Sequence, residues 1–222
     1  MDKCTITQID RKHIWHPFTQ MKDYEQMDHL VVTKAEGIKL YDVDGREYYD
    51  TVSSWWTSSL GHRHPVIMEA IKKQLEKLDH VIFAGITHPY ATGLVEKLKR
   101  FLPEYLTRFF FSDNGSTAVE VALKMAFQYH QNQGKKQKRK FVMLEGAYHG
   151  DTIGSVSVGG IDLYHQLYKP LMFESYMVKG LDCSRCPFRK SEFTEDARKT
   201  GCQLECFSNM RSIIENHHDE IA

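Results

Sequence analysis

The feature that most constrains the fold is a junction at which a short apolar strand passes through a tight turn into a long helix. The strand is predicted over residues 108–111, the turn over 112–115 and the helix from about 116 to 133, and a second apolar strand follows at 140–144. Strand, helix and strand in this order are typical of a βαβ unit, whose two strands are parallel. The sequence therefore predicts an α/β fold with a parallel-sheet core.

The residues before this core have a different pattern. Apolar residues alternate over 35–49, and Asp44 and Gly45 supply a turn, which predicts a β-hairpin. Two further helices are predicted, one beginning at Pro65 and one over 89–101.

Each predicted helix has apolar residues at helical spacing and is expected to turn them inward. They are Ile67, Ile71, Leu75 and Leu78 in the first helix, Leu94, Val95, Leu98 and Phe101 in the second, and Val121, Ala122, Met125, Ala126 and Tyr129 in the third. The last residues also read as a helix, from Met210 to His218, followed by Ile221 and Ala222, which could begin another strand.

Composition narrows the class of protein. Lys and Arg together number 29, as do Asp and Glu, so the formal net charge is zero and a nucleic-acid or membrane-surface partner is not expected. No apolar run approaches the roughly 20 residues of a membrane span, and the N-terminus does not resemble a signal peptide. Five cysteines without a secretion signal favour reduced thiols and a cytoplasmic location.

The turn at residues 112–115 is a candidate phosphate site. Gly115 lets the backbone come close to a ligand, and the N–H groups of Ser116, Thr117 and Ala118 are expected to be free at the positive end of the helix. The alternative is a simple helix cap, in which Ser116 satisfies the helix and binds nothing. The motif alone favours this alternative.

A second motif, residues 148–152, follows the next strand. Ligands of parallel sheets lie beyond the carboxyl ends of the strands, so Tyr148 is expected near the Gly115 turn, where its ring could stack on a flat heterocycle. The alternative is that Tyr148 and His149 are packing residues. Two such motifs at adjacent strand ends favour a ligand site.

Trp55 and Trp56 form a third motif. Of two adjacent tryptophans, one is usually buried and the other exposed. An exposed ring beside a pocket could line it for a long apolar substrate. The commoner alternative is a pair of core residues. The histidines of residues 61–65 are interpreted as part of a loop before a helix.

A cysteine-rich stretch over 176–207 is aperiodic and is expected to be a long loop or insertion. Its cysteines have a spacing compatible with tetrahedral zinc or an iron–sulfur cluster, and they are Cys183, Cys186, Cys202 and Cys206. The alternative is a set of reduced, unligated thiols. The two interpretations are nearly balanced, and we predict no metal.

Taken together, these motifs resemble the class III aminotransferases, which belong to the fold-type-I family that uses pyridoxal 5′-phosphate (PLP). The similar segments are residues 13–17, 53–56, 80–88, 113–126 and 148–152. The resemblance covers nearly the whole chain and weakens over 176–207. It implies a segment of the small domain at 1–62 and an incomplete PLP-binding large domain at 63–222.

The resemblance also implies roles for individual residues. Gly115 and Ser116 would bind the PLP phosphate, and Tyr148 would lie against the cofactor ring and the substrate. Trp55 would line the substrate pocket with Phe18. Many members of the family have a tyrosine where this chain has Phe18, so the usual amino donor of this type of enzyme, S-adenosylmethionine, could be replaced by lysine.

The resemblance implies a reaction between small-molecule substrates, in which an amino group is transferred to the ketone of 8-amino-7-oxononanoate in biotin synthesis. It also implies that the complete enzyme is a homodimer. The family's Schiff-base lysine and the aspartate that pairs with the ring nitrogen are expected beyond residue 222, so these 222 residues alone are expected to be inactive. Two alternatives stay open. One is another class III ω-aminotransferase, and the other is a non-catalytic truncated pseudoenzyme or zinc-loop module.

Overall fold

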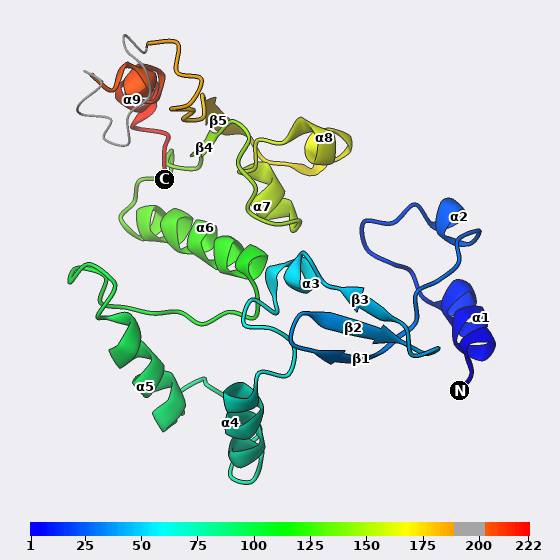
Figure 1. The fold of residues 1–222 in the computed structure, drawn as a ribbon. Helices are drawn as coiled ribbons and strands as arrows, with labels where there is room; N and C mark the ends of the chain where they lie inside the picture. The colour runs from blue at the N-terminus through cyan, green and yellow to red at the C-terminus, as the bar shows by residue number, and fades with distance from the viewer. Residues whose placement is uncertain (189–202) are drawn as a thin grey trace. The chain divides into compact units, whose positions relative to one another are not determined.

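The computed structural model of the chain describes residues 1–188 and 203–222 (Figure 1). It divides into two compact units, Met1–Leu94 and Val95–Ala222, each with its own internal contacts. Within the described residues, no helix is both long and apolar enough to span a membrane. The predicted division into 1–62 and 63–222 stays a prediction.

The first unit combines short helices with one antiparallel sheet, whose strand order is β1-β2-β3. Its elements are α1 (Lys3–His13), α2 (Met21–Tyr24), β1 (Val32–Glu36), β2 (Lys39–Asp42), β3 (Glu47–Tyr49), α3 (Ser53–Trp56), α4 (Pro65–Leu75) and α5 (Pro89–Leu98), of which α5 runs past the boundary of the unit.

The predicted hairpin is the β2–β3 pair, in which Leu40 faces Tyr48. Its turn is stabilised by Asp42, whose Oδ1 accepts the N–H groups of Asp44 at 2.9 Å and Arg46 at 2.8 Å. The structure adds a strand that the sequence did not predict, because a second turn at Gly37, with φ of +56°, folds β1 against β2.

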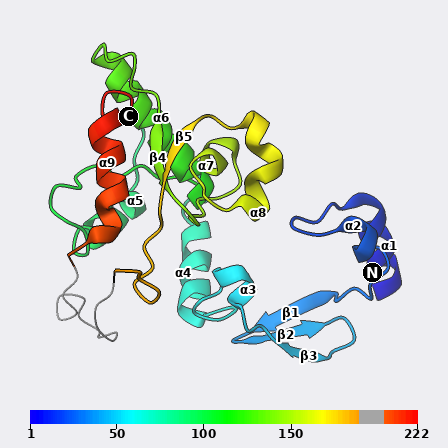
Figure 2. The same ribbon diagram turned by 90° about the horizontal axis from the view of Figure 1, so that it is seen from above.

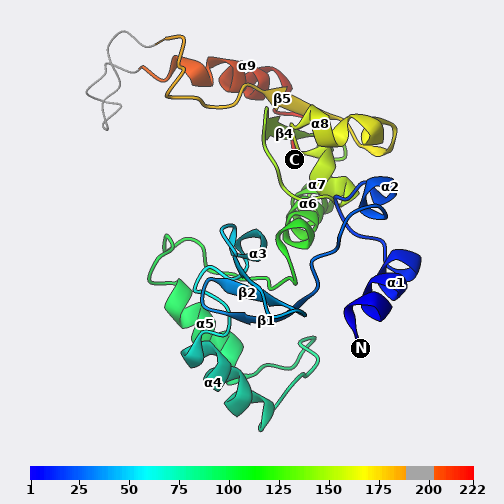
Figure 3. The same ribbon diagram turned by 45° about the vertical axis from the view of Figure 1, so that its right-hand side comes forward.

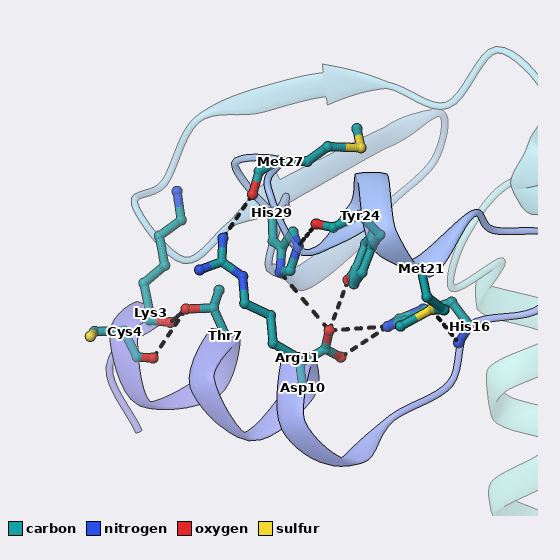
Figure 4. A network of polar contacts seen from close by, with 10 residues as sticks. All are labelled: Lys3, Cys4, Thr7, Asp10, Arg11, His16, Met21, Tyr24, Met27 and His29. Atoms are coloured by element: carbon teal, nitrogen blue, oxygen red, sulfur yellow. Dashed lines mark hydrogen bonds and ion pairs between the residues drawn. The ribbon is translucent and has the colours of Figure 1, made fainter.

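Helix α1 is held to the residues that follow it by a network centred on Asp10 (Figure 4). The carboxylate of Asp10 accepts the hydroxyl of Tyr24 at 2.8 Å and contacts Nε2 of His16 at 3.0 Å. The buried ring of His29 stacks on Tyr24 at 4.0 Å. Burial alone would raise the pKa of Asp10, but the hydrogen bonds from Tyr24 and His16 outweigh it and hold the pKa below its usual value. The network therefore fixes both ends of the loop that carries Phe18.

The second unit contains the predicted parallel sheet. Its elements are α6 (Gly115–Asn132), β4 (Phe141–Leu144), α7 (Ile153–Ser157), α8 (Asp162–His165), the 3₁₀ helix η1 (Gln166–Leu171), β5 (Ser175–Val178), the 3₁₀ helix η3 (Glu205–Phe207) and α9 (Ser208–His217). Strands β4 and β5 form a parallel pair, and α7, α8 and η1 connect them along the chain. Figures 1 and 3 both place the two strands between α6 and α9, and Figure 2 shows α8 on the side of the strands away from α9.

One sequence prediction in this unit is wrong, and another is wrong in part. Residues 108–111 form no strand, because within the described residues no neighbouring strand pairs with them. The stretch 176–207 was predicted as a loop, but its first residues belong to β5, whose apolar run was too brief to reveal a strand until β4 paired with it. Residues 189–202 of this stretch lie outside the described residues.

The helices form where they were predicted, but the prediction that their apolar faces turn inward is wrong. Ile67 and Ile71 of α4 are 44% and 48% exposed, and Met125 and Tyr129 of α6 are 52% and 59% exposed. Among the described residues, the buried apolar side chains are Val156, Val158 and Val178, which lie around α7 and β5. Helical periodicity determines which residues share a face, whereas burial also requires a second surface against that face.

The final residues continue the sheet, as expected. Ile221 forms a parallel bridge with Lys140, and the N–H of Ala222 donates to the Lys140 carbonyl at 2.9 Å. An ion pair at 2.9 Å joins Lys140 Nζ to Glu220, which also accepts the Tyr176 hydroxyl at 3.1 Å. Hydrogen bonds, first from Lys140 and then from His217 and Tyr176, lower the pKa of Glu220 to about 2.

We expect this pairing to make the stability of the second unit depend on pH. Because the pKa of Glu220 is lowered on folding, its contribution is complete above the ordinary value of 4.5 and is lost as the pH falls toward about 2. Urea unfolding should therefore show a deficit for Glu220→Gln at neutral pH that shrinks over this window. Glu174→Gln is the control, since Glu174 is 88% exposed and 3.8 Å from Lys140. A deficit that is independent of pH would contradict the assignment.

Candidate functional site

The start of α6 is capped by Asn114, not by Ser116. The side chain of Asn114 accepts the N–H of Thr117 at 2.9 Å, and its carbonyl accepts the N–H of Ala118 at 3.1 Å. The expectation that Thr117 and Ala118 offer free N–H groups is therefore wrong. Within the described residues, the N–H groups left without a partner at this helix end are those of Gly115 and Ser116.

Open space surrounds Gly115. A Cβ added to Gly115 would meet no other atom within 4 Å, and its φ is not in the left-handed region. The glycine is thus not needed for the backbone conformation, but its missing side chain leaves room beside two free N–H donors. Two donors at the positive end of an 18-residue helix make a fitting cradle for a phosphate.

The hydroxyl of Ser116 joins α6 to the start of α7. It accepts the N–H of Thr152 at 3.1 Å, lies 2.8 Å from the Thr152 hydroxyl, and donates to the hydroxyl of Ser155 at 3.1 Å. Gly150, with φ of +109°, makes this close approach possible, because a Cβ there would lie 2.5 Å from Ser116 Oγ. The structure therefore brings together the two motifs predicted at adjacent strand ends.

Two residues of this junction were missed by the sequence analysis. Ser155 is fully buried, and its hydroxyl donates to the Ser116 carbonyl at 3.1 Å. Glu120, one turn into α6, accepts the N–H of Gly154 at 2.7 Å and so caps α7 with a negative charge. Nothing in the local sequence signals either contact, since both join residues at least 34 positions apart.

Tyr148 lies at the edge of this junction with half of its side chain exposed. Its hydroxyl donates to Asp151 at 2.5 Å, and this hydrogen bond, with some burial, raises the pKa of Tyr148 to about 12. The phenol is therefore neutral at physiological pH. A neutral ring held by its hydroxyl presents one face for stacking.

The first unit contains the aromatic candidates. Phe18 and Trp55 meet edge to face with ring centroids 5.4 Å apart, and they are 65% and 57% exposed. Trp56 is 76% exposed, so the expectation that one tryptophan is buried is wrong, and a core pair is not observed.

The backbone that carries the tryptophans has an unusual conformation. The four residues of α3, Ser53–Trp56, have φ values of +51°, +47°, +61° and +66°. Left-handed backbone costs residues other than glycine roughly 1–2 kcal/mol each. Strain of this kind persists only where surrounding contacts enforce it, and it is concentrated at functional sites.

The predicted cysteine site lies partly outside the described residues. Cys183 is exposed, and Cys186 and Cys206 are half-buried, whereas Cys202 is not among the residues described. Within residues 1–188 and 203–222, no three His, Cys, Asp or Glu side chains are grouped to hold a metal ion. The absence of a metal stays a prediction, and a zinc or iron–sulfur site stays its alternative.

Comparison with known proteins identifies the family. The sequence pattern of the class III aminotransferases matches residues 20–222. The chain belongs to the class III aminotransferases. The resemblance inferred from the motifs is thereby confirmed, and with it the assignment to a family of PLP-dependent enzymes.

Several curated class III relatives carry one name. Adenosylmethionine-8-amino-7-oxononanoate aminotransferase of Methanocaldococcus jannaschii is 40% identical over 100% of this chain and 48% of the relative. The protein of the same name from Anoxybacillus flavithermus is 45% identical over 96% of this chain and 45% of the relative. The chain thus spans about half the length of the curated relatives it matches.

Solved structures confirm the fold. The crystal structure of the M. jannaschii aminotransferase has a TM-score of 0.84 and 38% identity over 99% of this chain and 46% of its own. An amine transaminase from an uncultivated Pseudomonas species, in its PLP-bound form, has a TM-score of 0.77 and 30% identity over 95% of this chain and 47% of its own. The predicted fold type and cofactor class are therefore those of the family.

Proposed function

We propose that this chain supplies the phosphate-binding and substrate-lining part of an aminotransferase that converts 8-amino-7-oxononanoate to 7,8-diaminononanoate in biotin synthesis. The observation that carries the proposal is the start of α6, where two free N–H groups stand beside open space and are tied by Ser116 to the Tyr148 motif. The specific reaction is supported by the shared name of relatives that are 40–45% identical over nearly the whole chain.

In the proposed site, the backbone N–H groups of Gly115 and Ser116 donate to the cofactor phosphate, and the helix dipole of α6 favours its charge. The hydroxyl of Ser116 acts indirectly, since its bonds to Thr152 hold the helix end in place. Tyr148 covers the cofactor ring, with its hydroxyl fixed by Asp151. When bound, PLP supplies the electron sink for moving an amino group between two carbon skeletons.

Phe18 and Trp55 form the proposed wall for the apolar chain of the substrate. Their edge-to-face contact leaves more than half of each ring available. Because Phe18 has no hydroxyl, the wall offers no hydrogen bond at this position. The amino donor is S-adenosylmethionine or lysine, and the absent hydroxyl keeps lysine as a candidate.

We further propose that these 222 residues bind cofactor phosphate without turning over substrate. Proton transfer in this chemistry needs a lysine beside the cofactor, and among the described residues no lysine side chain is hydrogen-bonded to residues 112–117. Lys140 is instead paired with Glu220. A homodimeric state and a cytoplasmic location stay predictions.

The proposal is tested with pyridoxine 5′-phosphate, which has the ring and phosphate of the cofactor but no aldehyde to react with surface lysines. We expect it to bind the 222-residue chain at least about tenfold more tightly than pyridoxine, since charge-assisted hydrogen bonds contribute roughly 1.5–3 kcal/mol. Equal binding of the two compounds would contradict the phosphate site. Formation of 7,8-diaminononanoate by this chain would contradict its predicted inactivity.

Substrate choice is tested by quenching of tryptophan fluorescence. 8-Amino-7-oxononanoate is expected to quench in a saturable way that Trp55→Ala abolishes. Equal quenching by a short ω-amino acid would instead favour another class III ω-aminotransferase.

A further inference from the structure

We propose that Asp50 is a positioning residue for Trp55: its carboxylate holds the left-handed turn of α3 and so sets the direction of the ring. This inference rests on the proposed role of Trp55 as a substrate wall.

The first observation is where Asp50 sits. It follows β3 directly, and its N–H donates to the Ile38 carbonyl at 2.9 Å, so its backbone is fixed by the sheet. Its side chain is only 6% exposed. A carboxylate this well buried must be compensated by hydrogen bonds, since an unpaired buried charge is very costly.

The compensation comes from the turn itself. Asp50 Oδ1 accepts the N–H of Ser54 at 2.9 Å, and Oδ2 accepts the Ser54 hydroxyl at 2.7 Å. Nε2 of His62 lies 2.8 Å from Oδ2. His62 is fixed in turn, because it exchanges backbone hydrogen bonds of 3.1 Å and 2.7 Å with Gly37 in the β1–β2 turn. One carboxylate thus clamps the turn against the sheet.

Asp50 restrains residues whose backbone dihedrals are unfavourable. Ser54, with φ of +47° and ψ of +57°, and Trp55, with φ of +61° and ψ of +47°, have left-handed conformations. Neither residue is a glycine, so without an external restraint the chain favours ordinary dihedrals. A change of φ at Ser54 would swing the Cα–Cβ bond of Trp55, and with it the ring that meets Phe18.

The test uses the full 222-residue chain labelled with 5-fluorotryptophan. The chain has three tryptophans, so three ¹⁹F signals are expected, assigned by replacing each tryptophan with phenylalanine. Phe18→Leu removes the ring contact between Phe18 and Trp55, so the resulting change in the Trp55 chemical shift shows how much of that shift depends on the contact. Asp50→Ala is expected to move or broaden the Trp55 and Trp56 signals by more than a line width and to leave the Trp15 signal in place.

A rescue separates positioning from general destabilisation. Glycine adopts left-handed backbone without a steric penalty, so adding Ser53→Gly to Asp50→Ala is expected to return the Trp55 signal toward its wild-type position. Asp28→Ala is the matched control in the same unit, because Asp28 is 86% exposed and forms an ion pair with Lys3. It should move none of the three signals.

A milder variant covers the case in which Asp50→Ala does not fold. Ser54→Ala removes one of the donors to Asp50 and is expected to shift the Trp55 signal in the same direction by a smaller amount. An unmoved Trp55 signal in the folded variants would overturn the proposal. Because the signals are read without cofactor or substrate, this result is independent of pyridoxine 5′-phosphate binding, which tests the proposed function separately.

Discussion

Gly150→Ala is expected to destabilise the second unit by about 3 kcal/mol, combining strained backbone with overpacking. A Cβ at residue 150 would overlap the side chain of Ser116 and approach its backbone at 2.9 Å, so rotation of the serine alone cannot relieve the clash. The φ of +109° adds strain that only glycine avoids. The start of α6 would therefore separate from Thr152.

The two contributions can be separated with Gly134→Ala. Gly134 has φ of +77°, but an added Cβ would meet nothing within 4 Å, so this variant reports backbone strain alone. Urea unfolding followed by far-ultraviolet circular dichroism should show a larger loss for Gly150→Ala. All three tryptophans lie in the first unit, so their fluorescence transition should not move. Equal losses for the two variants would contradict the Ser116–Gly150 contact.

Gly115→Ala is expected to have the opposite profile, weakening pyridoxine 5′-phosphate binding at least about tenfold while leaving stability unchanged or slightly higher. Residue 115 is the first residue of α6, it has ordinary dihedrals, and its Cβ would meet no protein atom. Alanine at a compatible glycine position usually stabilises by roughly 0.4–1 kcal/mol. The new methyl group would, however, occupy the space proposed for the phosphate.

Gly93→Ala is the matched control, because Gly93 lies within α5 and an added Cβ there also meets nothing within 4 Å. It should bind pyridoxine 5′-phosphate like the wild-type chain. Unchanged binding by Gly115→Ala would place the phosphate elsewhere. Reduced binding together with reduced stability would mean that the glycine has a structural role.

The predictions that succeeded depend on residues close together in the sequence, and those that failed depend on pairing between distant segments. The strand at 140–144, the turn at Asp44-Gly45 and the helix from about 116 depend on neighbouring residues and were predicted correctly. Residues 108–111 failed as a strand because a strand requires a hydrogen-bonded partner, and β5 was missed for the same reason. Composition and periodicity describe a segment, whereas pairing involves two.

The candidate site likewise has features that local sequence predicts and features that depend on the tertiary structure. The sequence by itself determined the family. It also predicted Gly115, Ser116 and Tyr148 as site residues, because a glycine before a helix and an aromatic after a strand are local patterns, and their roles stay a prediction. Only the tertiary structure showed that Asn114 takes the cap, that Ser116 is bound to Thr152, and that Asp50 is bound to Ser54 within a run of left-handed residues. These depend on hydrogen bonds whose directions are set by the folded backbone, and in the case of Ser116 and Thr152 the partners are 36 residues apart.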